Sequence, residues 1–283
     1  MTAMLTRLTL AAALLGLGAT PARADAAESH YRLALVHKQA GRHDQALREL
    51  DEALRLRPSF ADAHYTRGTV LRRMNRLEDA ATAFREATRL APENASAHGM
   101  LGATLIRLRQ YEAALVPLRR ATELAPDEAQ YWSNLGLAYR RLRRNDEAIR
   151  TYEQALATHP DDAGLLNNLA VALRRARRNE EAIVMLAAAL ERSPDSGEMH
   201  RNLAVTLRAS ERWEEAIPHF QRAVELGEDA PGVFFDLAIC YEQTGQLEPA
   251  IATYERYLRA LGDRDAAATQ RGRDRIQRLR DRQ

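Results

Sequence analysis

The segment from Ala129 to Asp162 reads AQYWSNLGLAYRRLRRNDEAIRTYEQALATHPDD. Its apolar residues lie three or four positions apart on both sides of the basic stretch Arg143-Arg144, and this spacing is typical of amphipathic helices. We therefore expect two helices joined by a short turn. The residues that carry this pattern are Trp132, Leu135, Gly136, Tyr139, Ala148, Tyr152, Ala155 and Pro160.

The same residues recur at one unbroken interval of 34 residues in both directions along the chain. We number each copy from 1 to 34, so that Ala129 is position 1 and Leu135 is position 7. Positions 7 and 8 are Leu33-Ala34, Arg67-Gly68, Leu101-Gly102, Leu135-Gly136, Leu169-Ala170, Leu203-Ala204 and Leu237-Ala238. Position 20 is Ala46, Ala80, Ala114, Ala148, Ala182, Ala216 and Ala250. Proline closes the first five copies at Pro58, Pro92, Pro126, Pro160 and Pro194.

This signature resembles the tetratricopeptide repeat, a helix-turn-helix unit of 34 residues. The resemblance implies an all-α, right-handed α-solenoid, which counts as one elongated domain because each repeat packs only on its neighbours. Within the solenoid, residues 25–264, the seven repeats are expected at 27–60, 61–94, 95–128, 129–162, 163–196, 197–230 and 231–264. Residues 265–283 are expected to form a C-terminal capping helix with one weak apolar face. The alternative for this segment is a basic tail for anionic surfaces.

Composition limits the function classes. The chain has 283 residues, of which 28% are charged and 46% hydrophobic, and its formal net charge is +2. These values are typical of a folded domain that does not span a membrane, and they do not indicate a nucleic-acid partner. Cys240 is the single cysteine, so an intrachain disulfide is excluded. Because it stands at position 10, which holds small residues in the other repeats, we expect a packed core residue.

Residues 1–24 have the features of a signal peptide. Arg7 precedes an apolar run from Leu8 to Leu17, and Ala22-Arg23-Ala24 provides a cleavage motif before Asp25. No cysteine lies near this point to carry a lipid anchor. The mature chain is therefore expected in the periplasm or outside the cell, with no stable membrane insertion. An uncleaved anchor is the alternative.

In the tetratricopeptide family, the side of the first helix that carries positions 2, 6, 9 and 13 lines a concave groove where partners bind. Position 6 holds asparagine in three consecutive repeats, Asn134, Asn168 and Asn202. An amide both donates and accepts hydrogen bonds, so this row is suited to a peptide backbone of any sequence. The row is similar to the asparagine ladder of the superhelical repeats of O-GlcNAc transferase. The alternative is that asparagine is simply common at this position.

Arginines and apolar residues flank the asparagines. Position 13 holds Arg107, Arg141 and Arg175, and position 12 is also basic in most repeats. These arginines would favour an acidic partner, or they are solvated helix ends. Position 9 forms an apolar floor of Leu137, Val171 and Val205. The carboxylate clamp of chaperone-binding relatives is matched in part, without its lysines, by Asn167, Asn168, Arg201 and Asn202.

We expect no enzymatic activity, because the chain has no nucleophile, phosphate-binding or metal-binding motif. His30, His64, His98 and His200 all stand at position 4, so the repeat spacing separates them too widely for one metal ion. Neither a cofactor nor a metal site is expected. The predicted function is therefore binding of a protein or peptide in the groove, most strongly at repeats 4 to 6. The alternative is a self-associating scaffold of a cell-envelope complex such as a pilus or secretion machinery, with a homo-oligomer as its consequence.

Overall fold

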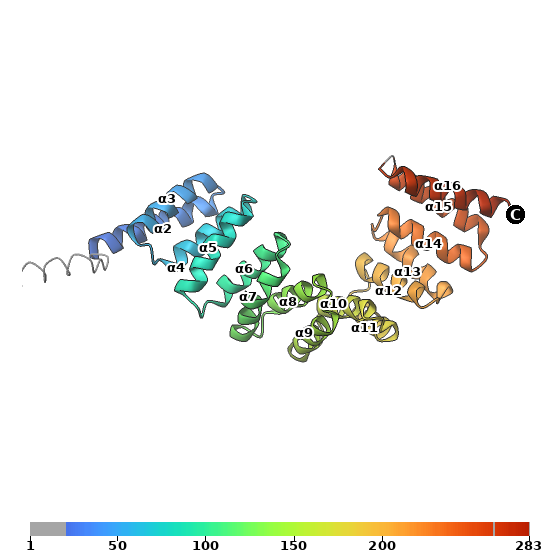
Figure 1. The fold of residues 1–283 in the computed structure, drawn as a ribbon, viewed down its shortest axis with the longest axis horizontal. Coiled ribbons are helices and arrows are strands. Elements are labelled where there is room, and N and C mark those ends of the chain that lie inside the picture. The colour runs from blue at the N-terminus through green and yellow to red at the C-terminus, as the bar shows by residue number, and fades with distance from the viewer. Residues whose placement is uncertain (1–20, 263, 283) are drawn as a thin grey trace, which may run out of the picture. The chain divides into compact units, whose positions relative to one another are not determined.

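The computed structural model describes residues 21–262 and 264–282. These residues form fifteen helices and no strand. The chain divides into two compact units, with the boundary between Ala125 and Pro126. Each unit is a stack of helix-turn-helix pairs, in which a first helix packs against a second helix and the second packs against the next pair (Figure 1). None of the described helices has the length and apolar character that crossing a membrane requires.

The N-terminal unit holds three pairs, which correspond to repeats 1 to 3. Its helices are α2 (Pro21–Gln39), α3 (His43–Leu56), α4 (Ala61–Arg73), α5 (Leu77–Leu90), α6 (Ala95–Arg107) and α7 (Tyr111–Leu124). Helix α2 begins before the first repeat, so the predicted cleavage point between Ala24 and Asp25 lies inside this helix. The rest of the predicted signal peptide, residues 1–20, lies outside the described residues.

The C-terminal unit holds four pairs and one further helix. Its helices are α8 (Ala129–Arg141), α9 (Asn145–Thr158), α10 (Ala163–Arg175), α11 (Asn179–Arg192), α12 (Gly197–Ala209), α13 (Trp213–Glu225), α14 (Pro231–Gln243), α15 (Leu247–Leu261) and α16 (Ala266–Arg280). From α4 to α14, every first helix begins at position 1 of its repeat.

Small residues at two positions allow the helices of a pair to pack closely. The alanine at position 20 is fully buried in all seven repeats. At position 8, a Cβ atom added to Gly136 would lie 2.3 Å from Cζ of Tyr152, the aromatic residue at position 24 of the second helix. Tyr152 is itself fully buried. The glycine therefore provides the space that the tyrosine ring fills.

The turn inside each repeat has a left-handed residue at position 15. It is Gly41 in the first repeat and Gly245 in the last, with φ of 72° and 73°. The intervening repeats place other residues in this conformation, with φ between 59° and 62°, namely Asn75, Arg109, Arg143, Arg177 and Glu211. In repeat 4, the next N–H, that of Arg144, returns to the carbonyl of Tyr139 and ends α8.

The ring at position 4 joins successive repeats. Trp132 donates its indole N–H to the carbonyl oxygen of Pro126, at position 32 of the preceding repeat, over 2.8 Å. His64, His98 and His200 make the same contact through Nε2, at 2.9 to 3.0 Å, with Pro58, Pro92 and Pro194. These histidines therefore have a structural role. No cluster of three His, Cys, Asp or Glu side chains suited to a metal ion occurs in the described part of the chain.

Helix α16 packs on α15 and closes the C-terminal end of the stack (Figure 1). Its apolar face consists of Ala268, Gly272, Ile276 and Leu279, which are buried. Gly272 allows a close approach, because a Cβ atom there would lie 2.7 Å from the side chain of Leu258 and 3.1 Å from the ring of Tyr257. Tyr257 stands where repeat 4 has Ala155, so the departure of repeat 7 from the repeat signature forms the contact with the cap.

Cys240 is fully buried in α14. Burial raises the pKa of its thiol to about 12, so the reactive thiolate is scarce at neutral pH. The cysteine is therefore a core residue of repeat 7.

Candidate functional site

The first helices α8, α10, α12 and α14 lie side by side in the C-terminal unit, each in contact with the next. We call the side of α8, α10 and α12 that carries positions 6, 9, 12 and 13 the first-helix face. It holds eight of the eleven predicted site residues, and two more, Asn167 and Arg201 at position 5, are their neighbours in the same helices. The eleventh, Arg107, belongs to α6 in the N-terminal unit, where it donates to Oδ1 of Asn75 over 2.7 Å.

Two of the asparagines bond to each other. Nδ2 of Asn202 donates to Oδ1 of Asn167 over 2.9 Å, and this bond links α12 to α10. Nδ2 of Asn167 in turn donates to Oε1 of Glu198 over 3.3 Å. Both amides are buried, with 5% and 6% of their surface exposed. Their hydrogen-bonding capacity is therefore largely used inside the fold, because a buried amide without partners is costly.

Asn168 is only partly buried and is better placed for a ligand. Its Nδ2 donates to Oγ of Ser133 on α8 over 3.2 Å, and its amide makes no other hydrogen bond with a described residue. Asn168 and Ser133 line a polar hollow of about 190 Å³, together with Gln130. Gln130 also donates to Oδ1 of Asn134 over 3.3 Å. The hollow thus has amide and hydroxyl groups that can bind a peptide backbone.

The predicted apolar floor is covered to different degrees. Val171 is buried, with 8% exposed, whereas Leu137 and Val205 are half-buried. Only the two half-buried residues therefore present apolar surface to a ligand.

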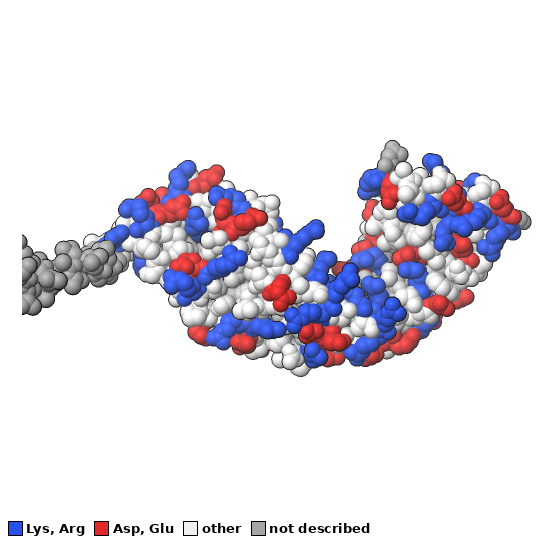
Figure 2. All heavy atoms as spheres, viewed as in Figure 1, with Lys and Arg blue, Asp and Glu red and all other residues white. Residues whose placement is uncertain are grey.

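The arginines at position 13 differ from those at position 12. Arg141 and Arg175 are exposed. Arg201, at position 5 of repeat 6, forms an ion pair of 2.8 Å with Glu228. Arg140 and Arg174, at position 12, are half-buried and form no ion pair with a described carboxylate. In Figure 2, Lys and Arg side chains gather over the region of α8 to α12.

Arg174 lies in an unfavourable charge environment. Burial lowers the pKa of its guanidinium, and the positive charges of Arg175, Arg140, Arg201 and Arg208 lower this pKa further. Its Nε atom is buried and has no hydrogen-bond partner among the described residues. The predicted site residues include the arginines at position 13, whereas the half-buried arginines without an ion pair stand at position 12. The basic run at position 12 is visible in the sequence, but its burial is not.

Asp236 is the acidic residue at position 6 of repeat 7, where repeats 4 to 6 have asparagine. Its Oδ1 lies 3.4 Å from Nε of Arg208, which is at position 12 of repeat 6. Burial raises the pKa of this carboxyl group, while the charges of Arg208 and Arg174 lower it. The arginine at position 12 of one first helix can therefore pair with a carboxylate at position 6 of the next.

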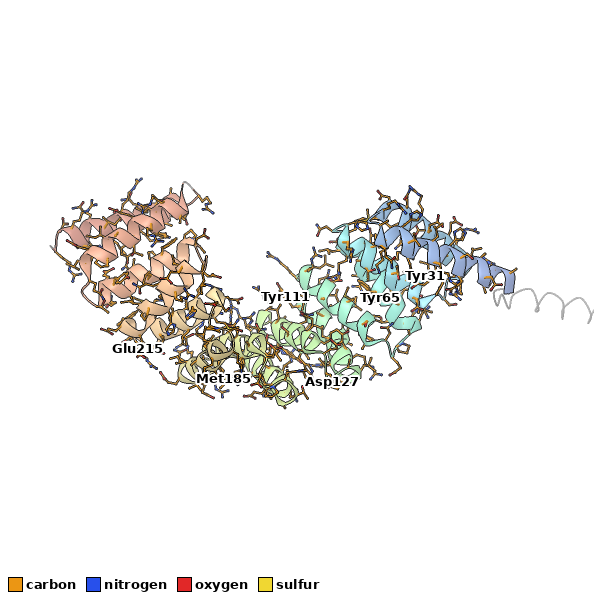
Figure 3. The ribbon with its side chains drawn as sticks, turned by 180° about the vertical axis from the view of Figure 1, so that it is seen from behind. Tyr31, Tyr65, Tyr111, Asp127, Met185 and Glu215 are labelled. Atoms are coloured by element: carbon orange, nitrogen blue, oxygen red, sulfur yellow. The ribbon has the colours of Figure 1, made fainter. Side chains whose placement is uncertain are left out.

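A second hollow in the same unit has a different chemistry. Its volume is about 320 Å³, and it lies among α9, α10 and α11. Leu169, Leu173, Val184 and Met185 line it, and Figure 3 labels Met185 on α11. Glu153, Glu180 and Glu181 also line it, and the last two form ion pairs with Arg212 and Arg178.

Comparison with known structures shows the fold. YrrB, described as a TPR protein with an unusual peptide-binding site, is 28% identical with a TM-score of 0.56, over 60% of this chain and 88% of YrrB. A tetratricopeptide repeat protein from Parabacteroides merdae has a TM-score of 0.66 at 13% identity, over 90% of this chain and 99% of that one. PilF of Pseudomonas aeruginosa has a TM-score of 0.59 at 21% identity, over 80% of this chain and 99% of PilF. The last two likenesses concern the fold alone.

Comparison with protein families agrees with the structures. No curated protein matches the sequence. The family described as "Cilia and flagella-associated protein 70 C-terminal domain" matches residues 2–233, and the family described as "Tetratricopeptide repeat" matches residues 207–271. The first match covers more than half of the chain. The chain therefore belongs to this family of tetratricopeptide repeat proteins, and its fold is that of a protein–protein interaction module.

Proposed function

We propose that the chain is a non-enzymatic module that binds an extended peptide segment of a partner protein across α8, α10 and α12. The observation that carries the proposal is the polar hollow beside Asn168, where an amide with unused hydrogen-bonding capacity meets the side chains of Ser133 and Gln130. Half-buried Leu137 and Val205 add apolar surface for side chains of the peptide. The description of YrrB as a protein with a peptide-binding site supports this reading.

The test is a pull-down from envelope extract with residues 25–283 as bait. A second bait carries Asn134→Ala and Asn168→Ala, which are both half-buried and outside the buried Asn167–Asn202 pair. A third bait carries Asn179→Ala on α11 as the matched control. We expect a protein that the wild type and the control retain and the double variant loses. Equal retention by all three folded baits would exclude the first-helix face as the binding surface.

The proposal includes export to the periplasm, which rests on the features of residues 1–24. N-terminal sequencing of the protein purified from the envelope fraction tests it. We expect the mature chain to begin at Asp25. A chain that begins at Met1 or Thr2 would contradict cleavage.

Self-association is a second candidate function, because the first repeat exposes apolar residues that later repeats bury. Leu33 at position 7 is 43% exposed and Val36 at position 10 is 53% exposed. In repeat 4, the corresponding Leu135 and Ala138 are 4% and 0% exposed. A second copy that covered this end would bury the two side chains. Light scattering that showed a concentration-independent monomer would exclude this function, and Leu33→Glu is expected to reduce any association.

A further inference from the structure

The half-buried arginines at position 12 are poorly neutralised. Arg140 and Arg174 come from adjacent first helices, and neither has a described carboxylate within ion-pair distance. Glu198 is the acidic group that interacts with Arg140, but its Oε1 already accepts from Asn167. Like charges of this kind are destabilising when burial reduces solvent screening. A ligand carboxylate would supply the missing negative charge.

Arg208 shows that an arginine at position 12 can pair with a carboxylate. It continues the row of position 12 in repeat 6, and the carboxylate of Asp236 lies 3.4 Å from it. Asp236 comes from the neighbouring helix α14, at the position where the asparagines stand on α8, α10 and α12. In the row, Arg208 therefore has a carboxylate of the protein at ion-pair distance, whereas Arg140 and Arg174 have none among the described residues.

The spacing between successive arginines at position 12 restricts the conformation and the sequence of the bound peptide. First helices of neighbouring repeats pack roughly 8–10 Å apart. A peptide in the polyproline II conformation has three residues per turn and rises about 3.1 Å per residue, so side chains three residues apart lie on one side about 9 Å from each other. This interval matches the roughly 8–10 Å expected between neighbouring first helices, and hence between the arginines that they carry at the same position. In a β-strand, residues three apart point to opposite sides.

We propose that the peptide bound on the first-helix face carries acidic side chains three residues apart, one facing Arg140 and one facing Arg174. This inference rests on the proposed function and names the chemistry of its partner. Asp236 already pairs with Arg208, the third arginine of the row, so the wild-type protein needs only two acidic residues of the peptide, one for each remaining arginine. The bound segment is extended and acidic, and its backbone lies along the hollow beside Asn168.

Fluorescence anisotropy with labelled nine-residue peptides tests the spacing. The probe is Glu-Pro-Pro repeated three times, which favours polyproline II. One comparison peptide replaces every Glu with Gln, and another has the same composition with its glutamates two residues apart. We expect the first peptide to bind at least about tenfold more tightly than either, since a hydrogen bond to a charged group contributes about 1.5–3 kcal/mol. Added salt is expected to weaken its binding. Equal affinities for the three peptides would overturn the spacing.

Substitutions of Arg140 and Arg174 test whether these two arginines bind the acidic peptide. Arg140→Gln and Arg174→Gln are each expected to weaken binding of the Glu-Pro-Pro peptide about tenfold, whereas the control Arg150→Gln, exposed on α9, leaves it unchanged. Circular dichroism checks that each variant is folded. Unchanged binding by folded Arg174→Gln would contradict the proposal.

Asp236→Asn provides a gain-of-function test. Asparagine is the residue of repeats 4 to 6 at this position, and the substitution leaves Arg208 without its carboxylate. The variant is expected to bind the three-glutamate peptide several-fold more tightly than the wild type does. For a peptide with two glutamates, Glu-Pro-Pro-Glu-Pro-Pro-Gln-Pro-Pro, the affinity of the Asp236→Asn variant should differ little from that of the wild type. No gain for the three-glutamate peptide would contradict the role assigned to Arg208.

Two outcomes separate this inference from the proposed function. An envelope protein that requires Asn134 and Asn168 for retention, together with no preference for acidic peptides, would refute the acidic spacing and leave peptide binding intact. If an unlabelled oligothymidylate displaced the labelled Glu-Pro-Pro peptide as well as the unlabelled peptide does, the proposal that the acidic ligand is a peptide would be refuted.

Discussion

Asn202→Ala should destabilise the C-terminal unit, because it removes the donor to Oδ1 of Asn167. That oxygen has no other described donor, and Asn167 is only 6% exposed, so water reaches it poorly. Loss of one partner of a buried hydrogen bond costs about 1–3 kcal/mol. The bond from the hydroxyl of Thr206 to the backbone carbonyl of residue 202 is unaffected. We therefore expect the free energy of unfolding to fall by about 2 kcal/mol, or the melting temperature by roughly 4–8 °C.

Urea unfolding followed by circular dichroism measures this change, provided that the slope of the transition is the same in each variant. A double-mutant cycle with Asn167→Ala isolates the bond between the two amides, and we expect a coupling energy of about 1 kcal/mol or more. Asn168→Ala is the control, because its half-buried amide can bond to water and should cost less than about 1 kcal/mol. Additive effects of the two buried substitutions would refute the reasoning that this amide pair stabilises the packing of α10 on α12.

Three further predictions concern other parts of the fold. Gly136→Ala should lower the free energy of unfolding by about 1–3 kcal/mol in urea, because the added methyl group would overlap the ring of Tyr152, and an unchanged transition would contradict this. Arg143→Gly should raise it by up to about 1 kcal/mol, since a left-handed backbone strains a residue with a Cβ atom, and a lower urea midpoint would disprove that account. Burial, and then the charge of His200, lower the pKa of His219 below its ordinary value of 6.5. As the pH falls, the unfolded chain therefore protonates His219 before the folded chain does, so the free energy of unfolding should decrease below about pH 6.5. His219→Gln should reduce the decrease between about pH 7.5 and 5.5, and an equal decrease in the variant would contradict this account.

Much of the fold was predictable from the sequence because its signals are local and repeated. The interval of 34 residues, the small residues at positions 8 and 20 and the prolines near the repeat ends all recur in register. Cys240 at position 10 was correctly predicted to be a buried core residue for the same reason. The role of the ring at position 4 was not predicted, because its acceptor is a backbone carbonyl. Every residue has such a carbonyl, so the sequence does not indicate which one accepts the bond.

The candidate site depends on contacts between repeats, which the repeat register alone does not determine. Helical periodicity places Asn168 and Asn202 at the same position of α10 and α12, so the sequence treats them as equivalent. The structure separates them, since Asn202 meets Asn167 inside the packing and Asn168 lines a hollow.

The sequence by itself determined the family, the helices and the residue types available on each face. Tertiary structure decided which arginines are half-buried, as at Arg174, and which of them meets a carboxylate, as Arg208 meets Asp236. The physical reason is that desolvation and hydrogen bonding depend on distances set by the packing of neighbouring helices, whereas periodicity specifies only the direction of a side chain around its own helix.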